Sequence, residues 1–259
     1  MAAASVRMGV RVWLDSLAAA GSPALPPILP DNARHWPLWA RTIHALIRAH
    51  CRLVFRLRSD PSTVPAEGGA ILVANHHAGP DPLFLIATNR RLLSFLIAAE
   101  YYRVRALNWL LARVGCVPVD RRRVTASALR GMRERLEAGR VVGIFPEGGI
   151  HPPGKRVRPK PGAALLALES GAPVVPARVS GIRQLPGSDL WTFLRPRRVG
   201  LRYGPPVPLD DLRRRYRAAK AARSADTDPL AAGGESGESR AAVEEAARRI
   251  VDAIYALPA

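Results

Sequence analysis

The sequence predicts a single α/β domain in which a mostly parallel central sheet is flanked by helices, together with an N-terminal amphipathic helix. Two observations lead to this prediction. From residue 70 onward, short apolar stretches of strand length recur along the chain, and helical patterns separate them. Short buried strands that alternate with helices are typical of α/β domains with a largely parallel sheet.

The N-terminal part of the chain divides into two segments. Residues 1–35 are rich in Ala and Pro and keep no stable period, so we expect a flexible arm there. Residues 36–64 contain an amphipathic helix, because apolar residues recur every three or four positions from 36 to 58 and arginines fill much of the remaining surface. Such a helix packs on the domain or lies on an anionic bilayer, and both interpretations stay open.

Residues 65–223 are expected to form the main domain. We predict strands at residues 70–74, 94–98, 116–119, 141–145, 174–179 and 199–203. We predict helices at residues 82–88, 107–114, 124–138, 162–170 and 210–223. The Gly-, Ser- and Asp-rich residues 224–239 indicate a flexible loop, and residues 240–259 resume helical spacing as a C-terminal helix.

Composition limits the function classes. The 259 residues carry 39 basic and 21 acidic side chains, a net charge of +18, and only three of the basic residues are lysines. A surface of this kind suits anions. Nucleic acid is not the expected partner, because the arginines are scattered and no aromatic RNA-binding motif is recognisable. The two cysteines make neither a disulfide framework nor a Cys-rich zinc site, so we expect buried thiols and no metal.

No ordinary transmembrane helix is expected. The longest stretch without Asp, Glu, Lys or Arg spans residues 16–30 and contains four prolines. A membrane-spanning helix needs roughly 20 apolar residues. The N-terminus also lacks the clean apolar core of a signal peptide. We therefore expect a cytoplasmic protein that associates peripherally with the inner face of the membrane.

The most informative stretch is ILVANHHAGPDP at residues 71–82. An apolar strand runs into His76, and a Gly-Pro turn leads to Asp81, where Asp followed by Pro is a strong helix start. Active sites of parallel sheets lie at such strand ends. A carboxylate that reaches an imidazole fixes its tautomer and stabilises the imidazolium, as a general base requires. The alternative is that Asp81 only caps a helix and His76 is a polar loop residue.

Three further stretches combine strands with polar or turn residues. In GCVPVDRRR at 115–123 a strand is followed by three arginines, which suit phosphate or form a solvated charge run. In VVGIFPEGG at 141–149 a buried strand leads to Glu147 and Gly148, placed to accept hydroxyl hydrogen bonds and to let a ligand approach closely, or forming an ordinary turn. In GAPVVPARV at 171–179 a strand contains Pro176, and Lys160 precedes the helix before it.

In this order the four stretches resemble the glycerolipid acyltransferase family, the lysophosphatidic acid acyltransferases and their relatives. The resemblance covers roughly residues 65–205. The matching blocks are Asn75-His76 with Asp81, Gly115 through Arg121, Phe145-Pro146-Glu147-Gly148, and Val174-Val175-Pro176.

This resemblance implies an O-acyltransferase. His76 would deprotonate the hydroxyl of a lysophospholipid, first of all 1-acyl-glycerol-3-phosphate, and the product would be phosphatidic acid. Asp81 would orient His76 and stabilise its positive form. The acyl group would come from acyl-CoA or acyl carrier protein, with no other cofactor and no acyl-enzyme.

The resemblance also implies roles for the other blocks. Arg121 would bind the phosphate of the acceptor, and Glu147 and Gly148 would help to hold the acceptor. Lys160 and Pro176 are further candidates for contacts with substrate. An anionic membrane surface would be the other partner.

One departure from the family pattern bears on the acceptor. Members often follow Phe-Pro-Glu-Gly with Thr-Arg-Ser, whereas this chain has Gly149-Ile150-His151, and the nearest cations are Lys155, Arg156 and Arg158. The alternatives are therefore another lyso-lipid, such as an ornithine-type one, another alcohol, or a catalytically inactive basic lipid-binding relative.

Overall fold

A seven-stranded sheet forms the centre of the computed structural model, which describes residues 28–103, 105–119, 125–155, 157–186, 189–225 and 237–259. The order of the strands across the sheet is β1-β7-β6-β2-β5-β3-β4. Their bounds are β1 Arg58–Ser59, β2 Ala70–Ala74, β3 Leu93–Ala98, β4 Val117–Val119, β5 Val141–Ile144, β6 Val174–Ser180 and β7 Gly200–Tyr203.

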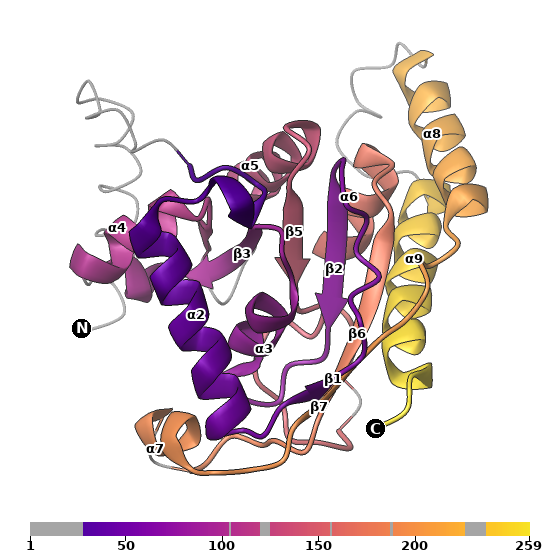
Figure 1. Ribbon diagram of the computed structural model, residues 1–259. Coiled ribbons are helices and arrows are strands. Elements are labelled where there is room, and N and C mark those ends of the chain that lie inside the picture. Colours follow the sequence, from indigo (N-terminus) through magenta and orange to yellow (C-terminus); the bar gives the residue numbers. More distant parts are fainter. Residues whose placement is uncertain (1–27, 104, 120–124, 156, 187–188, 226–236) are drawn as a thin grey trace, which may run out of the picture.

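The sheet is mostly parallel, as the sequence predicts. Strands β6, β2, β5, β3 and β4 run in one direction, and β7 pairs antiparallel with β6. Short β1 pairs parallel with β7 at one edge of the sheet. The carboxyl ends of the parallel strands therefore meet at one edge, which is the lower edge in Figure 1. Residues that follow β2 and β5 are thereby brought together.

One face of the sheet is covered by four helices: α5 Ala126–Glu137, α6 Gly162–Ser170, α8 Asp210–Ala225 and α9 Gly237–Ala256. Apolar side chains of these helices form one core with alternate residues of β2 and β5, such as Ile71 and Val142. Thr125 caps α5, because its side chain accepts a hydrogen bond from the Ala128 N–H. Gly171 ends α6 in the left-handed conformation, which glycine adopts readily.

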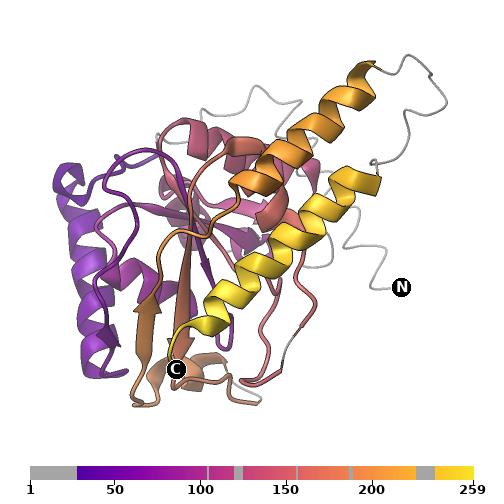
Figure 2. The ribbon, with the colours of Figure 1, turned by 90° about the vertical axis from the view of Figure 1, so that its right-hand side faces the viewer.

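The opposite face is covered by α2 Leu38–Leu53, α3 Asp81–Thr88, η2 Ala99–Arg103 and α4 Arg105–Arg113. Figure 2 shows α2 on one side of the molecule and α8 and α9 on the other. The second core contains Leu72 and Ala74, which alternate with the residues of the first core, together with Phe55 and Phe84. Both faces of the sheet are thus covered, as is usual for parallel strands.

The amphipathic helix ends earlier than the sequence predicts. Helical spacing continues to Arg58, but α2 stops at Leu53 and Arg58 belongs to β1. The chain reverses at Arg56, whose φ of 43° lies in the left-handed region. The Leu57 N–H donates to the Cys51 carbonyl across this reversal. Residues 58 and 59 then hydrogen-bond along β7, so tertiary pairing overrides the helical pattern.

Residues 28–35, which the sequence assigns to the flexible arm, are instead packed on the domain. Leu29 is buried, and its N–H donates to the Arg113 carbonyl. The Asp31 carboxylate forms an ion pair with Arg91 at 2.7 Å. Residues 33–35 form the short helix η1, Ala33–His35. The remainder of the predicted arm, residues 1–27, lies outside the described residues.

The other predicted segments agree closely with the structure, except for two short elements. The predicted strands and helices of the main domain match within about two residues at each end. The predicted loop is bounded by α8, which extends to Ala225, and α9, which begins at Gly237; residues 226–236 lie outside the described residues. The sequence did not predict β1 or the six-residue α7, Asp189–Leu194. None of the described helices is both long enough and apolar enough to cross a membrane.

Candidate active site

The candidate site lies where two neighbouring parallel strands end. His76 follows β2 by two residues, and Glu147 follows β5 by three. These strands are hydrogen-bonded to each other, with Val73 opposite Ile144. The His76 backbone N–H points at the Glu147 carboxylate, 3.4 Å from Oε2, and the His76 carbonyl accepts from the His151 N–H at 2.9 Å. Backbone contacts at His76 therefore connect the turn after β2 with the turn after β5.

Asp81 is turned back toward the loop that precedes its own helix. Its Oδ2 lies 2.9 Å from His76 Nδ1, 2.7 Å from the His77 backbone nitrogen and 2.8 Å from that of Ala78. Its side chain does not cap α3, whose N-cap position is Pro80. Asp81 is fully buried, and an ionised carboxylate so buried requires donors of this kind. The geometry favours the interpretation of Asp81 as a partner of His76 over that of a helix cap.

The hydrogen bonds around Asp81 also fix the tautomer of His76. Because Oδ2 already accepts two backbone N–H groups, it acts as an acceptor toward the ring, and Nδ1 carries the proton that it receives. Nε2 of the neutral ring is then the basic atom. The ring stacks on Phe145, with centroids 4.2 Å apart and planes 20° apart. The His76 side chain keeps 16% of its surface exposed, so that a substrate can reach it.

Glu147 is buried between two donors from distant parts of the chain. The hydroxyl of Tyr255, in the last turn of α9, donates to Oε1 at 2.7 Å, and the His76 N–H faces Oε2. Only 4% of Glu147 is exposed. The sequence did not predict the role of Tyr255, because 108 residues separate it from Glu147 and its position in a helical stripe gives no sign of it.

A cation lies over the turn that follows Glu147. Lys160 Nζ is 3.4 Å from the Gly148 carbonyl, and the Lys160 N–H donates to the Pro146 carbonyl at 2.8 Å. Gly148 has a φ of 69°, and a side-chain carbon there would come within 2.3 Å of the Lys160 stem. The positive φ favours glycine at this position, whereas the Lys160 side chain is flexible and could move aside. Lys160 thus places a positive charge beside Gly148, whereas Arg158 extends toward Glu244.

Asn75 holds the end of β2 to the end of β6. Its side-chain amide donates to the Val179 carbonyl and its Oδ1 accepts from the Val179 N–H, both at 2.8 Å. Asn75 is fully buried. Its role is to fix the strand end from which His76 projects. His77 is likewise structural, since it is buried and its Nδ1 donates to the His151 carbonyl at 2.9 Å.

Pro176, a predicted substrate contact, does not join this cluster. Pro176 is buried in β6, opposite Val73 of β2, and a buried position inside the sheet offers no surface to a substrate. Arg121 lies outside the described residues, which end at Val119 of β4 and resume at Thr125. The described cluster therefore consists of His76, Asp81, Glu147, Gly148 and Lys160, with Tyr255 behind Glu147.

This arrangement can carry out general base chemistry on a hydroxyl. A partly exposed imidazole has its tautomer and orientation set by a buried carboxylate, which also stabilises the imidazolium that forms on proton uptake. Both cysteines lie elsewhere and are buried, and burial raises the pKa of Cys51 to about 12 and that of Cys116 to about 11. Neither thiol is therefore suited to act as a nucleophile near neutral pH.

Comparison with known proteins identifies a matching family model and similar sequences. Residues 58–180 match the model of a family described as Acyltransferase. A 1-acyl-sn-glycerol-3-phosphate acyltransferase of Streptococcus pneumoniae is 28% identical over 146 residues, which cover 56% of this chain and 52% of the relative. Another, from Borreliella burgdorferi, is 30% identical over 115 residues, covering 44% of this chain and 46% of the relative. The chain spans about half the length of these two relatives.

The fold is also similar to a solved structure. The 1-acyl-sn-glycerophosphate acyltransferase of Thermotoga maritima superposes with a TM-score of 0.55 at 23% sequence identity. The similarity covers 85% of this chain and 82% of that protein. It extends beyond the residues matched by the family model, and so includes most of the helices that surround the sheet.

Proposed function

We propose that the protein transfers an acyl group from a thioester to the hydroxyl of a lysophospholipid, because residues 58–180 match the model of the acyltransferase family. The first candidate acceptor is 1-acyl-glycerol-3-phosphate, the substrate in the names of the matched relatives, which would yield phosphatidic acid. The contact between His76 Nδ1 and Asp81 Oδ2 supports this proposal most directly, because it prepares a basic nitrogen at a strand end.

In the proposed reaction, His76 Nε2 takes the proton of the acceptor hydroxyl while the hydroxyl oxygen attacks the carbonyl carbon of the thioester. The new C–O bond forms and the C–S bond breaks. The sulfur leaves as a thiol, after taking the proton from the His76 imidazolium. Asp81 stabilises the imidazolium between these two proton transfers. No covalent acyl-enzyme is needed.

The acceptor would be held by the turn after β5 and by Arg121. Arg121 would bind its phosphate, and Glu147 and Gly148 would contact its glycerol part. Lys160 adds a second positive charge beside Gly148, which favours an acceptor that carries a phosphate. The donor would be acyl-CoA or acyl carrier protein, with no further cofactor.

Product identification tests the proposed activity. The purified protein is incubated with acyl-CoA or acyl carrier protein and a panel of lyso-lipids, and the products are identified by mass. We expect phosphatidic acid from 1-acyl-glycerol-3-phosphate. The panel includes ornithine-type lyso-lipids, because Gly149-Ile150-His151 replaces the common Thr-Arg-Ser. If only these lipids are acylated, the acceptor is not 1-acyl-glycerol-3-phosphate. If no acceptor gives a product, the protein is a lipid-binding relative without acyltransferase activity.

We also propose that the protein docks on an anionic membrane through α2 and α7. One face of α2 packs on the domain, but Leu38, Leu46 and Leu53 are 77%, 64% and 77% exposed. At 100° per residue these leucines lie on one outward stripe of the helix. Arg41, Arg48 and Arg52 border the stripe and are also exposed. An apolar stripe beside arginines is typical of helices that lie in the interface of a bilayer.

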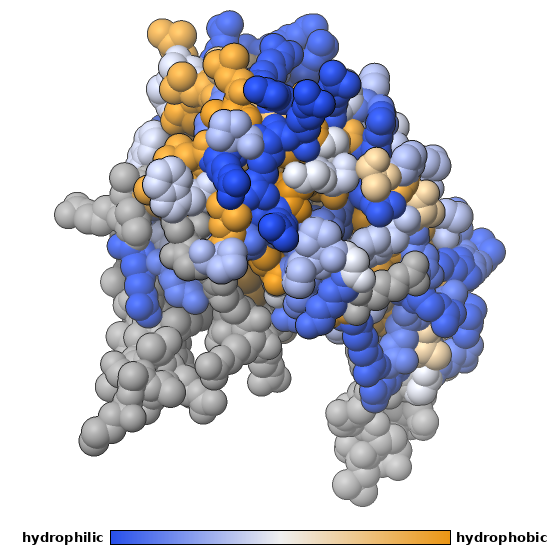
Figure 3. Space-filling model, turned by 90° about the horizontal axis from the view of Figure 1, so that it is seen from below, coloured by the Kyte–Doolittle hydropathy of each residue, from blue (hydrophilic) through white to orange (hydrophobic). Residues whose placement is uncertain are grey.

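The short helix α7 extends this surface to the active site. Leu190 and Trp191 are 66% and 62% exposed, whereas Phe193 packs against Gly79 in the loop after His76. Figure 3, which shows this lower edge, has hydrophobic side chains gathered on the side where α7 lies, with hydrophilic side chains between them. Docking through α7 would therefore bring the bilayer close to His76, where a lipid acceptor must enter.

The arginines that follow α7 suit an anionic bilayer. Burial, together with the neighbouring charges of Arg195 and Arg183, lowers the pKa of Arg197, and its Nη1 donates to the Arg183 carbonyl at 3.3 Å. The backbone N–H of Arg197 donates to the Val54 carbonyl at the end of α2, which joins the two halves of the docking surface. Such a surface would hold the protein peripherally on the inner face of the membrane, where anionic lipids are abundant.

A further inference from the structure

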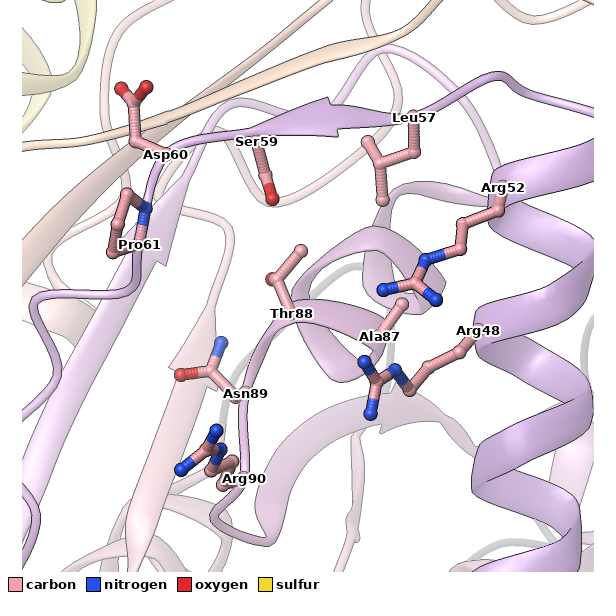
Figure 4. Close-up of a pocket in the computed structure, with 10 residues that line it drawn as sticks. All are labelled: Arg48, Arg52, Leu57, Ser59, Asp60, Pro61, Ala87, Thr88, Asn89 and Arg90. Carbon is pink, nitrogen blue, oxygen red and sulfur yellow. The ribbon is translucent and has the colours of Figure 1, made fainter.

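A polar cavity lies away from His76, between α2, the segment that follows α2 and the end of α3. Its volume is about 460 Å³, within the range of small-molecule sites. Figure 4 shows the residues that line it: Arg48, Arg52, Leu57, Ser59, Asp60, Pro61, Ala87, Thr88, Asn89 and Arg90. None of them belongs to the stretches at 71–82 or 141–149, so the cavity is separate from the candidate active site.

Three guanidinium groups line this cavity. Arg48 and Arg52 lie one turn apart on α2 and extend toward the last turn of α3, and Arg90 follows α3. Within the described part of the chain, no carboxylate forms an ion pair with any of the three. Like charges that line one cavity without a paired carboxylate repel one another, and a bound anion would reduce this repulsion.

The other polar groups of the cavity are already engaged. Asp60, the acidic residue of the lining, forms an ion pair with Arg202 at 2.6 Å, and Figure 4 shows its carboxylate directed away from the arginines. Asn89 donates to Leu85 and Tyr203, and the Thr88 hydroxyl is bonded to Phe84 and Tyr203. The arginines and the Ser59 hydroxyl are thus the groups that remain to bind a ligand.

We propose that this cavity binds the phosphate group of a ligand other than the acyl acceptor, and that Arg48, Arg52 and Arg90 hold its oxygens. Planar guanidinium groups match phosphate oxygens in paired hydrogen bonds. The apolar side chains of Leu57, Pro61 and Ala87 would face the uncharged part of the same ligand.

Two sources of such a phosphate are consistent with the position of the cavity. Arg52 is adjacent to the exposed Leu53, so the headgroup of an anionic phospholipid could enter while its acyl chains lie along α2. Alternatively, the phosphates of the nucleotide part of acyl-CoA could enter, because α3 leads from the cavity to Asp81 over only about 10 Å of helix. This second source depends on the proposed acyl transfer, and the first does not.

Binding measurements without turnover test the site in the intact protein. The probes are adenosine 3′,5′-bisphosphate, measured by calorimetry, and vesicles of phosphatidylcholine with or without phosphatidic acid, measured by sedimentation. Arg52→Gln removes one charge from the cavity, and Ser59→Leu fills it without a change of charge. Arg215→Gln is the matched control, because it removes the same charge from an exposed position of α8, outside both the cavity and the docking surface. Unchanged melting temperatures establish that the variants fold.

We expect Arg52→Gln and Ser59→Leu to weaken binding of one probe by about tenfold or more, with Arg215→Gln close to the unaltered protein. Loss of bisphosphate binding would assign the site to the nucleotide of the donor. Loss of binding to phosphatidic acid vesicles alone, by Ser59→Leu as well as by Arg52→Gln, would assign it to a lipid headgroup, because Ser59→Leu keeps the charges of the docking surface. If neither probe binds, or if Arg215→Gln has the same effect as Arg52→Gln, the cavity is not a phosphate site. His76→Ala should still bind the probe, so the test of the cavity does not depend on whether the protein transfers acyl groups.

Discussion

Asp81 Oδ2 and His76 Nδ1 are 2.9 Å apart, although a Gly-Pro turn and the start of a helix separate the two residues. The same oxygen accepts two backbone N–H groups of that turn, so the turn itself is folded around the carboxylate. The imidazole is therefore held by a group that cannot move without breaking three hydrogen bonds. Pre-organisation of this kind lets a base act without reorganisation during the reaction.

Removal of the Asn75 side chain should destabilise the fold. Asn75→Ala leaves the N–H and carbonyl of buried Val179 without their partners, and we expect the free energy of unfolding to fall by about 2–4 kcal/mol. Urea denaturation measures this change. Asn32→Ala is the control, because it removes a single exposed hydrogen bond at η1 and should cost about 1 kcal/mol or less. Equal losses in the two variants would show that Asn75 does not hold β2 to β6.

Loss of the Tyr255 hydroxyl should weaken acceptor use through Glu147. Tyr255→Phe removes a hydrogen bond of 2.7 Å to a buried carboxylate, and we expect kcat/KM for the acceptor to fall about tenfold with the donor KM unchanged. Steady-state kinetics with each substrate varied in turn separates these effects.

Tyr216→Phe is the control for Tyr255→Phe. The Tyr216 hydroxyl donates to Glu169 on α6, which is not part of the candidate active site. Loss of this hydroxyl should leave the kinetics unchanged. A Tyr255→Phe variant with unchanged acceptor kinetics would show that Tyr255 does not position Glu147.

Local sequence signals account for most of the fold and for most residues of the site. The strands β2, β5 and β6 were predictable because each is a short apolar run bounded by turn residues, and His76 and Asp81 lie within one such motif. Helix α7 has only six residues, too few to show a period. The end of α2 was mispredicted because pairing of Arg58 with β7 depends on residues more than 140 positions away.

The remaining contacts of the site arise from packing between distant segments. Tyr255 reaches Glu147 only because α9 packs on the sheet. The contact between Lys160 and the Gly148 carbonyl depends on the fold of the loop between them, which has no periodic pattern in the sequence. Leu29 and Trp36 are buried although their surroundings are rich in Pro and Ala, since they pack against Leu92 rather than within a helix. Composition of a segment therefore does not reveal whether the domain covers it.

Membrane docking should depend on both charge and the apolar side chains of α7. The protein should sediment with vesicles that contain phosphatidic acid, and 1 M salt should release most of it, because screening shortens electrostatic interactions to about 3 Å. Trp191→Ser should weaken binding about tenfold, since an exposed aromatic side chain is lost from the surface. Unchanged affinity of this variant, with complete release by salt, would restrict docking to electrostatics.

The two thiols should be unreactive in the folded protein. Burial raises the pKa of Cys51 to about 12 and that of Cys116 to about 11, whereas an unperturbed thiol has a pKa of about 8.5. At pH 8 the thiolate fraction of each is therefore lower by roughly a hundredfold or more. Mass spectrometry after treatment with iodoacetamide should detect no adduct in buffer and two in urea. Rapid native labelling of Cys51 would show that α2 opens frequently.

The rate of acyl transfer by His76→Ala tests the proposed mechanism most directly. The rate is measured with 1-acyl-glycerol-3-phosphate and the donor that the product panel identifies, alongside His35→Ala, which alters an exposed histidine of η1. We expect His76→Ala to lose activity by about a thousandfold with an unchanged melting temperature, and His35→Ala to match the unaltered protein. A folded His76→Ala variant that retains activity within a few-fold of the unaltered protein would contradict the assignment of His76 as the general base.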